Sequence, residues 1–151
     1  MSSIYEYVLE VSETDIDIVG HVNNVVYVQW MQDAAIAHSA ALGWTVERYQ
    51  QLGAGWVARL HQIEYLQPAY AGDRVIIRTW VADMKKVSST RKYEMIRYDK
   101  DSTKPTVLAV AHTNWVFIGF EQRVPRRIPV EIAAAFPLLD SSSAENGELG
   151  S

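Results

Sequence analysis

The stretch TDIDIVGHVNN, residues 14–24, gathers side chains suited to acid–base chemistry beside a glycine and two asparagines. Carboxylates such as Asp15 and Asp17 can take a proton from water, and His21 stands in the same stretch. A helical pattern follows at once, and the free N–H groups at a helix start favour negative charge. Those N–H groups can hold a developing oxyanion. An acid beside an oxyanion site, next to an apolar helix, suits hydrolysis of an acyl group.

The same residues also suit a purely structural role. An Asp side chain can form a local turn, and Gly20 permits a tight bend. Either Asn23 or Asn24 can cap the helix that follows, because an Asn oxygen accepts from the N–H groups of the first turn. Spacing alone leaves the catalytic and the structural interpretation open.

A long helix is predicted over residues 24–42. Its apolar positions recur at steps of three and four, the spacing of one helix face, at Tyr27, Val28, Met31, Ala35, His38 and Leu42. Gly43 ends it, because glycine adopts the left-handed conformation without steric cost. A short second helix is expected between Thr45 as cap and Gly53 as stop.

The rest of the chain has β character. Strands are predicted at residues 4–11, 56–66, 73–83, 88–99 and 106–120, from their β-branched and aromatic residues and the turn signals between them. Short connections imply antiparallel pairing, since parallel strands need a long crossover. Residues 127–136 predict a short helix with Pro129 in its first turn.

These elements predict an α+β architecture in which one long helix buries its apolar side on one antiparallel sheet. Exposed strand edges in such a sheet favour pairing between subunits, so we expect a homodimer or homotetramer. The domain is expected over residues 1–136. Residues 137–151, rich in serine, glycine and acids, are expected to form a disordered tail.

Composition excludes several classes of function. The net charge of −4 argues against nucleic-acid binding, and the absence of cysteine excludes disulfides and thiolate sites. No apolar run is long enough to cross a bilayer and no signal peptide is apparent, so a cytoplasmic protein without membrane contact is expected. The histidines lack metal-ligand spacing, so no metal is expected. His38 is predicted to be buried, and His61 and His112 to be structural.

The pattern D-x-D-x-x-G-H-V-N-N-x-x-Y at residues 15–27 resembles the hotdog-fold acyl thioesterases, nearest to the 4-hydroxybenzoyl-CoA thioesterase family. Its HVNN is similar to that of plant acyl-ACP thioesterases. Supporting stretches are IEYLQPAYAGD, STRKYE and the closing RIP. The resemblance implies a hotdog fold, a long central helix wrapped by one sheet. It also implies hydrolysis of an acyl-CoA or acyl-ACP thioester without a cofactor, and active sites between subunits.

The resemblance also assigns roles to residues of the opening motif. Asp17 matches the catalytic aspartate, which acts as general base or as nucleophile. Backbone N–H groups from Gly20 to Val22 and at the helix start would polarise the carbonyl. His21 matches an active-site histidine, Asn24 positions the substrate or caps the helix, and Asp15 shapes the loop.

Two departures from the plant enzymes favour a simpler mechanism centred on Asp17. Val19 stands where those enzymes carry an Asn, and Pro68 or Ala69 stands where they carry a further acid. Neither residue type can replace the polar group. A plant-type catalytic network is therefore not expected.

The CoA-binding prediction falls on KKVSSTR between two strands, at Lys85, Lys86, Ser88 and Arg91. These residues can bind the phosphates of the nucleotide or form a solvated turn protected by its charge. Residues 126–127 are a weaker candidate. Trp30, Trp56, Trp80 and Trp115 are predicted to be core or interface residues. The alternative functions are a hotdog hydratase or dehydratase, and a non-catalytic acyl-CoA-binding protein.

Overall fold

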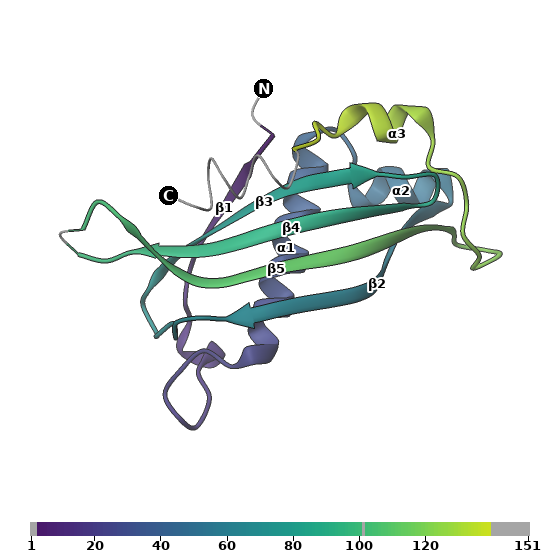
Figure 1. Cartoon of the computed structure of the whole chain (residues 1–151). Helices are drawn as coiled ribbons and strands as arrows, with labels where there is room; N and C mark the ends of the chain where they lie inside the picture. The colour runs from purple at the N-terminus through teal and green to yellow at the C-terminus, as the bar shows by residue number, and fades with distance from the viewer. Residues whose placement is uncertain (1–2, 101, 140–151) are drawn as a thin grey trace.

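A computed structural model describes residues 3–100 and 102–139, in which one long helix lies across a five-stranded antiparallel sheet (Figure 1). The strands are β1 (Tyr5–Glu10), β2 (Ala54–Tyr65), β3 (Arg74–Met84), β4 (Ser88–Tyr98) and β5 (Pro105–Gly119). Their order across the sheet is β1-β3-β4-β5-β2, with every neighbouring pair antiparallel. The predicted α+β architecture and the predicted strand positions are confirmed.

The central helix, α1 (Asn24–Ala41), begins and ends where the sequence indicates. The side chain of Asn23 accepts from the backbone N–H of Val25 at 3.1 Å, so Asn23 is the cap. Gly43, with φ of 94°, turns the chain after the helix. Two shorter helices, α2 (Val46–Leu52) and α3 (Val130–Ala135), follow.

The ends of the shorter helices agree with the predictions except at one proline. Thr45 caps α2 through its side chain, which accepts from Arg48 N–H at 3.2 Å, and Gly53 ends this helix in a left-handed conformation. A single 3₁₀ turn, η1 (Glu13–Asp15), lies between β1 and α1. Pro129 is the cap residue of α3 rather than a residue of its first turn.

The core is divided into two clusters along α1. The first fills the space between the amino-terminal half of α1 and the sheet, around Tyr27, Met31 and Met95. The second lies near α2 and α3, around Trp44 and Phe136. The buried face of α1 consists of Tyr27, Trp30, Met31, Ala34, Ala35, His38 and Ser39. The predicted face is therefore confirmed at Tyr27, Met31, Ala35 and His38, whereas Val28 and Leu42 are half-buried.

β2 and β1 are the two edges of the sheet. β2 presents apolar side chains to solvent along its length, with Val57 41%, Leu60 47% and Tyr65 41% exposed. A long edge strand with exposed apolar residues is a surface that another strand can cover.

The predicted tail begins with paired residues. Leu138 forms a bridge with Val81 of β3, and the Leu139 N–H donates to the Val81 carbonyl at 2.9 Å. Residues 138–139 therefore lie against β3, within the segment that was expected to be a disordered tail. The remaining part of the predicted tail, residues 140–151, lies outside the described residues.

Candidate active site

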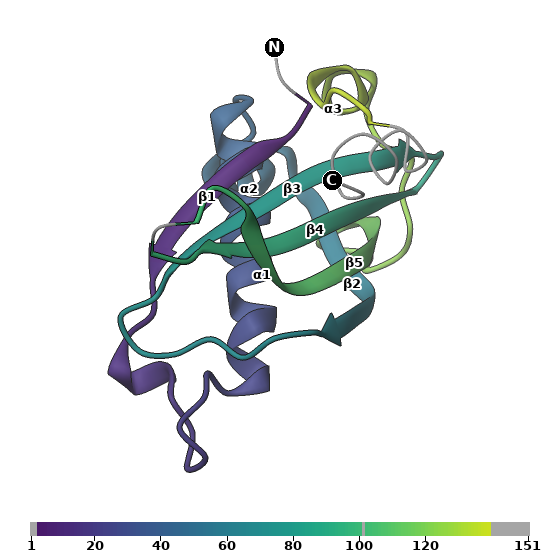
Figure 2. The ribbon, with the colours of Figure 1, turned by 60° about the vertical axis from the view of Figure 1, so that its left-hand side comes forward.

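The segment before α1 is a tight hairpin that projects beyond the sheet (Figures 1 and 2). The Asp17 N–H donates to the His21 carbonyl at 2.9 Å, and the Gly20 N–H donates to the Asp17 carbonyl at 3.0 Å. Gly20 has φ of 85°, a left-handed conformation that favours glycine. Ile18 and Val19 form the tip and are 102% and 67% exposed. The tip of the hairpin is therefore apolar and open to solvent.

Asp17 is half-buried at the base of this hairpin. Its Oδ1 accepts from the Val19 N–H at 3.0 Å, the local turn expected of the structural interpretation. Its Oδ2 has no hydrogen-bond donor within the described ranges. The carboxylate is thus oriented by one oxygen and open at the other.

The backbone donors predicted around Asp17 are only partly available. The Gly20 N–H already donates to Asp17, and the Val22 N–H donates to the Ala69 carbonyl at 3.0 Å. Their assignment as oxyanion donors is therefore wrong, because the hairpin and its docking on residue 69 use both groups. In the part of the chain that the structure describes, the N–H groups of His21 and Asn24 have no acceptor. These two N–H groups can still donate hydrogen bonds to an oxygen atom of a ligand.

The other residues of the motif have separate roles. His21 is exposed, and its ring meets the edge of Tyr70 with 5.4 Å between ring centroids. The Asn24 carbonyl accepts from the Tyr65 hydroxyl at 2.9 Å, which ties the start of α1 to β2. Asp15 accepts from the Ser12 N–H at 3.0 Å and shapes the turn before the hairpin, as expected.

The predicted CoA-binding residues do not form one cluster. Lys85 and Lys86 are exposed in the turn between β3 and β4, and the half-buried Ser88 begins β4. Arg91 is only 5% exposed. Side chains alternate between the two faces of a strand, and Arg91 lies in the buried row of β4 with Ser89 and Tyr93. It cannot join the lysines on the surface, so this part of the prediction is corrected. The second candidate pair, at residues 126–127, is exposed.

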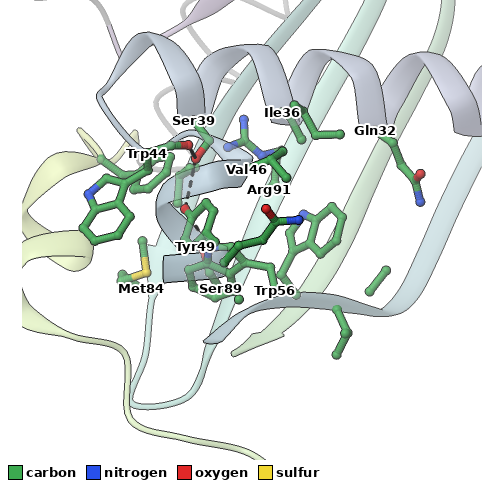
Figure 3. Close-up of a pocket in the computed structure, with 18 of the residues that line it drawn as sticks. Gln32, Ile36, Ser39, Trp44, Val46, Tyr49, Trp56, Met84, Ser89 and Arg91 are labelled. Atoms are coloured by element: carbon green, nitrogen blue, oxygen red, sulfur yellow. Dashed lines mark hydrogen bonds between the residues drawn. The ribbon is translucent and has the colours of Figure 1, made fainter. Parts of the chain in front are cut away.

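A pocket of about 770 Å³ lies between α1, α2 and the sheet (Figure 3). Its mouth is formed by exposed residues that include Ile36, Val46 and Val57, and its inner wall by buried ones that include Ser89 and Arg91. Aromatic side chains make up much of the lining: Trp44, Tyr49, Trp56, Trp115, Phe120 and Phe136. Trp56 and Trp115 therefore line the pocket, whereas Trp30 and Trp80 are buried as predicted.

A hydrogen-bonded group holds one wall of the pocket in place (Figure 3). The Tyr49 hydroxyl lies 2.9 Å from Ser39 Oγ and accepts from Trp56 Nε1 at 3.1 Å. Ser39 Oγ donates to the Trp44 carbonyl at 2.7 Å. Burial raises the pKa of Tyr49, so the hydroxyl stays neutral. These contacts join α1, α2 and β2 around the cavity.

Arg91 and His38 meet beneath α1. Arg91 Nη1 donates to His38 Nδ1 at 2.9 Å and to Thr79 Oγ1 at 3.1 Å. The pKa of His38 is lowered to about 4, mainly by burial and to a lesser extent by the positive charge of Arg91. His38 is therefore neutral near pH 7, which allows Nδ1 to accept. The predicted burial of His38 is confirmed, with 3% of the residue exposed.

The other two histidines lie on β2 and β5. His61 Nδ1 is 2.8 Å from Thr113 Oγ1, a contact between neighbouring strands that fits its predicted structural role. His112 is half-buried on β5. The described residues contain no group of three His, Asp or Glu side chains that could hold a metal ion.

Within a single chain, the hairpin and the lysine turn (the turn between β3 and β4 that carries Lys85 and Lys86) lie at opposite ends of α1 (Figure 1). The 18 residues of α1 span about 27 Å, and the pocket lining begins at Gln32, eight positions into that length. Asp17 precedes the helix, whereas Lys85 and Lys86 lie near α2 and α3. The structure therefore does not bring the predicted catalytic and CoA-binding residues together within one chain.

Sequence reasoning missed most of the pocket. Ser39 and Tyr49 drew no attention because their hydrogen bonds depend on how three successive elements, α1, α2 and β2, pack together, which no local pattern encodes. A signal for Arg91 was present: it stands two residues from Tyr93 and two from Ser89, at the spacing of a strand face that turns inward. Because Arg91 stands in a charged stretch, it was nevertheless predicted to lie on the surface.

A family model and several solved structures are similar to this chain. A family model described as the thioesterase-like superfamily matches residues 11–136. A 1,4-dihydroxy-2-naphthoyl-CoA thioesterase from Synechocystis has a TM-score of 0.79 at 19% identity, covering 88% of this chain and 95% of that one. A gentisyl-coenzyme A thioesterase has a TM-score of 0.77 at 23% identity, covering 88% of this chain and 100% of that one.

A third similar structure holds a ligand. It is a hypothetical protein from Staphylococcus aureus in complex with CoA, with a TM-score of 0.79 at 13% identity, covering 87% of this chain and 80% of that one. At these identities the solved structures show a shared fold. Among the described helices of the present chain, none is long and apolar enough to cross a membrane.

Proposed function

Because this chain belongs to the thioesterase-like superfamily, we propose that it hydrolyses acyl-CoA thioesters to the free acid and CoA. Membership confirms the predicted class of enzyme, a thioester hydrolase. We assign the reaction to Asp17 because its carboxylate is held by the Val19 N–H at Oδ1 and is open at Oδ2. The N–H groups of His21 and Asn24 supply donors close to it in sequence.

Two mechanisms fit this arrangement. As general base, Asp17 Oδ2 accepts a proton from a water molecule whose oxygen attacks the thioester carbonyl carbon. The carbonyl oxygen becomes an oxyanion held by the two N–H groups, and collapse of the intermediate breaks the C–S bond. The departing thiolate takes up a proton. As nucleophile, Oδ2 attacks the carbonyl carbon, and the C–S bond breaks to release the thiolate and leave a mixed anhydride. Water then hydrolyses the anhydride to the free acid and restores the Asp17 carboxylate. His21 orients the reacting groups.

We assign the carrier as CoA, with acyl-ACP as the alternative. The turn at Lys85 and Lys86 places two exposed cations beside Ser88, where phosphates of a nucleotide can bind them. A protein of the same fold binds CoA, which supports the choice. Arg91 takes no part in this contact, because it lies beneath α1.

The active enzyme is proposed to be a homodimer or a homotetramer. One chain separates Asp17 from the lysines by the length of α1, so a second copy is needed to bring both to one substrate. The exposed edge of β2 and the apolar hairpin tip are the surfaces that such a copy would cover. A two-fold pairing of β2 strands sets residues near the strand centre opposite their own copies.

A matched pair of substitutions tests this interface. Leu60 on β2 and Val8 on β1 are 47% and 46% exposed on opposite edge strands. Leu60→Lys places like charges near one another across a β2 pairing, so the dissociation constant measured by analytical ultracentrifugation should rise. Val8→Lys should leave it unchanged. Wild-type protein that is monomeric at micromolar concentration and above would contradict the proposal.

The activity is tested by free-thiol release from a panel of aliphatic and aromatic acyl-CoAs. Wild-type protein should release thiol from at least one of them far above the uncatalysed rate. Binding without release would favour a non-catalytic acyl-CoA-binding protein. Loss or gain of an acyl double bond without thiol release would indicate the hydratase or dehydratase alternative.

A further inference from the structure

We propose that the pocket binds acyl groups whose far end carries a carboxylate, and that Arg91 pairs with that carboxylate. This inference rests on the proposed thioester hydrolysis and adds the class of acyl group. Arg91 becomes a specificity-determining residue in the interior of the pocket, not a contact for CoA phosphates.

The first observation is the position of the charge. Arg91 reaches from β4, the middle strand of the sheet, toward α1 (Figure 3). It is 5% exposed and still lines the pocket. Among the described residues of the lining it is the single ionisable cation, and no Asp or Glu is present there.

The second observation is that the guanidinium lacks an anionic partner. Nη1 donates to a neutral imidazole and to a hydroxyl. Within the described ranges, its Nε and Nη2 groups have no acceptor and no carboxylate lies within ion-pair distance. Burial lowers the pKa of Arg91, and the groups that oppose this effect are Tyr93 and Tyr49 rather than a carboxylate. A buried charge is unfavourable unless it is paired, so the pocket is electrostatically incomplete when empty.

The neutral state of His38 strengthens the argument. A protonated His38 would repel Arg91 and could not accept from it, but burial keeps its pKa near 4. The contact therefore orients the guanidinium without neutralising it. The planar group keeps an edge of N–H donors available, at Nε and Nη2, and such an edge matches the two oxygens of a carboxylate.

The third observation is the chemistry of the path to Arg91. The lining combines the exposed Ile36 and Val57 with aromatic side chains such as Trp56 and Trp115 and with the buried Arg91. These walls suit a polymethylene chain or an aromatic ring. A thioester at the mouth and a carboxylate at the inner wall are thus the two ends of one acyl group.

A purely structural role for Arg91 makes a different prediction. If Arg91 only fastens β4 to α1 through His38, its replacement alters stability and affects all substrates alike. If it binds a carboxylate, its replacement changes the ratio between substrates of equal chain length. The ratio is therefore the informative quantity.

The experiment compares suberoyl-CoA with octanoyl-CoA, which have equal numbers of acyl carbons and differ in the terminal carboxylate. Wild-type kcat/KM should favour suberoyl-CoA by about tenfold or more, the range expected of a charge-assisted hydrogen bond. Arg91→Met should lower that ratio by a similar factor. Arg91→Lys, which keeps the charge and loses the planar fork, should retain part of the preference. Adipoyl-CoA and hexanoyl-CoA provide the same comparison at a shorter length.

Binding distinguishes failure of this inference from failure of the proposed function. Quenching of tryptophan fluorescence reports occupancy of a pocket lined by Trp44, Trp56 and Trp115, whether or not the thioester is hydrolysed. Tighter binding of suberoyl-CoA without thiol release would overturn the thioesterase and support the carboxylate pocket. Hydrolysis of octanoyl-CoA at equal or greater efficiency than suberoyl-CoA would overturn the pocket and leave the thioesterase. Should Arg91→Met not fold, the wild-type comparison alone decides.

Discussion

Replacement of Asp17 by Asn separates the catalytic role of the hairpin from its structural role. The structure shows what the change preserves. Oδ1 accepts from the Val19 N–H at 3.0 Å, and the amide oxygen of Asn can accept the same bond. The Asp17 backbone bonds to His21 and Gly20 do not involve the side chain. What the change removes is the basicity of the open Oδ2.

The expected loss of stability is small. A partly exposed hydrogen bond to a charged acceptor becomes one to a neutral acceptor, a difference of about 1 kcal/mol or less. For a chain of 151 residues this corresponds to a fall in Tm of roughly 2–4 °C at most. A larger fall would mean that the carboxylate has structural contacts beyond its turn.

The expected loss of activity is large. Removal of a general base lowers the rate by about 10²–10⁴-fold, or roughly 3–5 kcal/mol of transition-state stabilisation. Removal of a nucleophile lowers it further. Acyl-CoA affinity should change little, because Asn has nearly the size and shape of Asp. His21→Ala should lower the rate less than Asp17→Asn, since His21 orients and does not react.

The assay follows thiol release from the best acyl-CoA of the panel, with Tm and acyl-CoA affinity measured on the same samples. Asp15→Asn is the matched control, because Asp15 is an acid of the same segment that accepts from the Ser12 N–H. It should retain activity. Near-normal turnover by folded Asp17→Asn protein, or equal losses in both variants, would refute the catalytic assignment and leave the hairpin as a turn.

Further outcomes follow from the lysine turn and from His38. The double variant Lys85→Gln, Lys86→Gln should raise KM for acyl-CoA more than it lowers kcat, and the increase in KM should shrink as salt rises. The control Lys104→Gln, in the loop between β4 and β5, should change neither constant. Unchanged kinetics in the double variant would mean that the turn is only a solvated turn. The pKa of His38 is lowered from 6.5 to about 4, so keeping His38 neutral stabilises the fold above pH 6.5. This contribution is lost as the pH falls toward 4, and the free energy of unfolding should fall by about 3 kcal/mol in all. Unfolding by urea across this pH range should show the decline, and His38→Gln should flatten it.

Local patterns were sufficient for the secondary structure. The three-and-four spacing of α1 and the asparagine before it predicted the helix and its start, because caps and amphipathic faces depend on residues close in sequence. Turn residues between β-branched runs likewise predicted the long strands. The hairpin residues were identified as candidates because residue types that do chemistry stood together within a few positions.

Longer-range features depended on pairing between distant segments. The sequence could not show that the Val22 N–H is used by the carbonyl of residue 69, so the range of oxyanion donors was too wide. The order of strands, with β1 beside β3 and β2 beside β5, also follows from contacts that no local pattern encodes.

Arg91 shows the limit most clearly. By sequence it stands among Lys85 and Lys86, and local charge indicated a surface cluster. The register of β4 turns its side chain under α1, where the neutral His38, more than fifty positions away, accepts from it. The sequence by itself determined the elements, the reactive residue types and the family, because each is written in neighbouring residues. Only the tertiary structure decided which charge is buried, because burial is set by the segments that pack over a side chain.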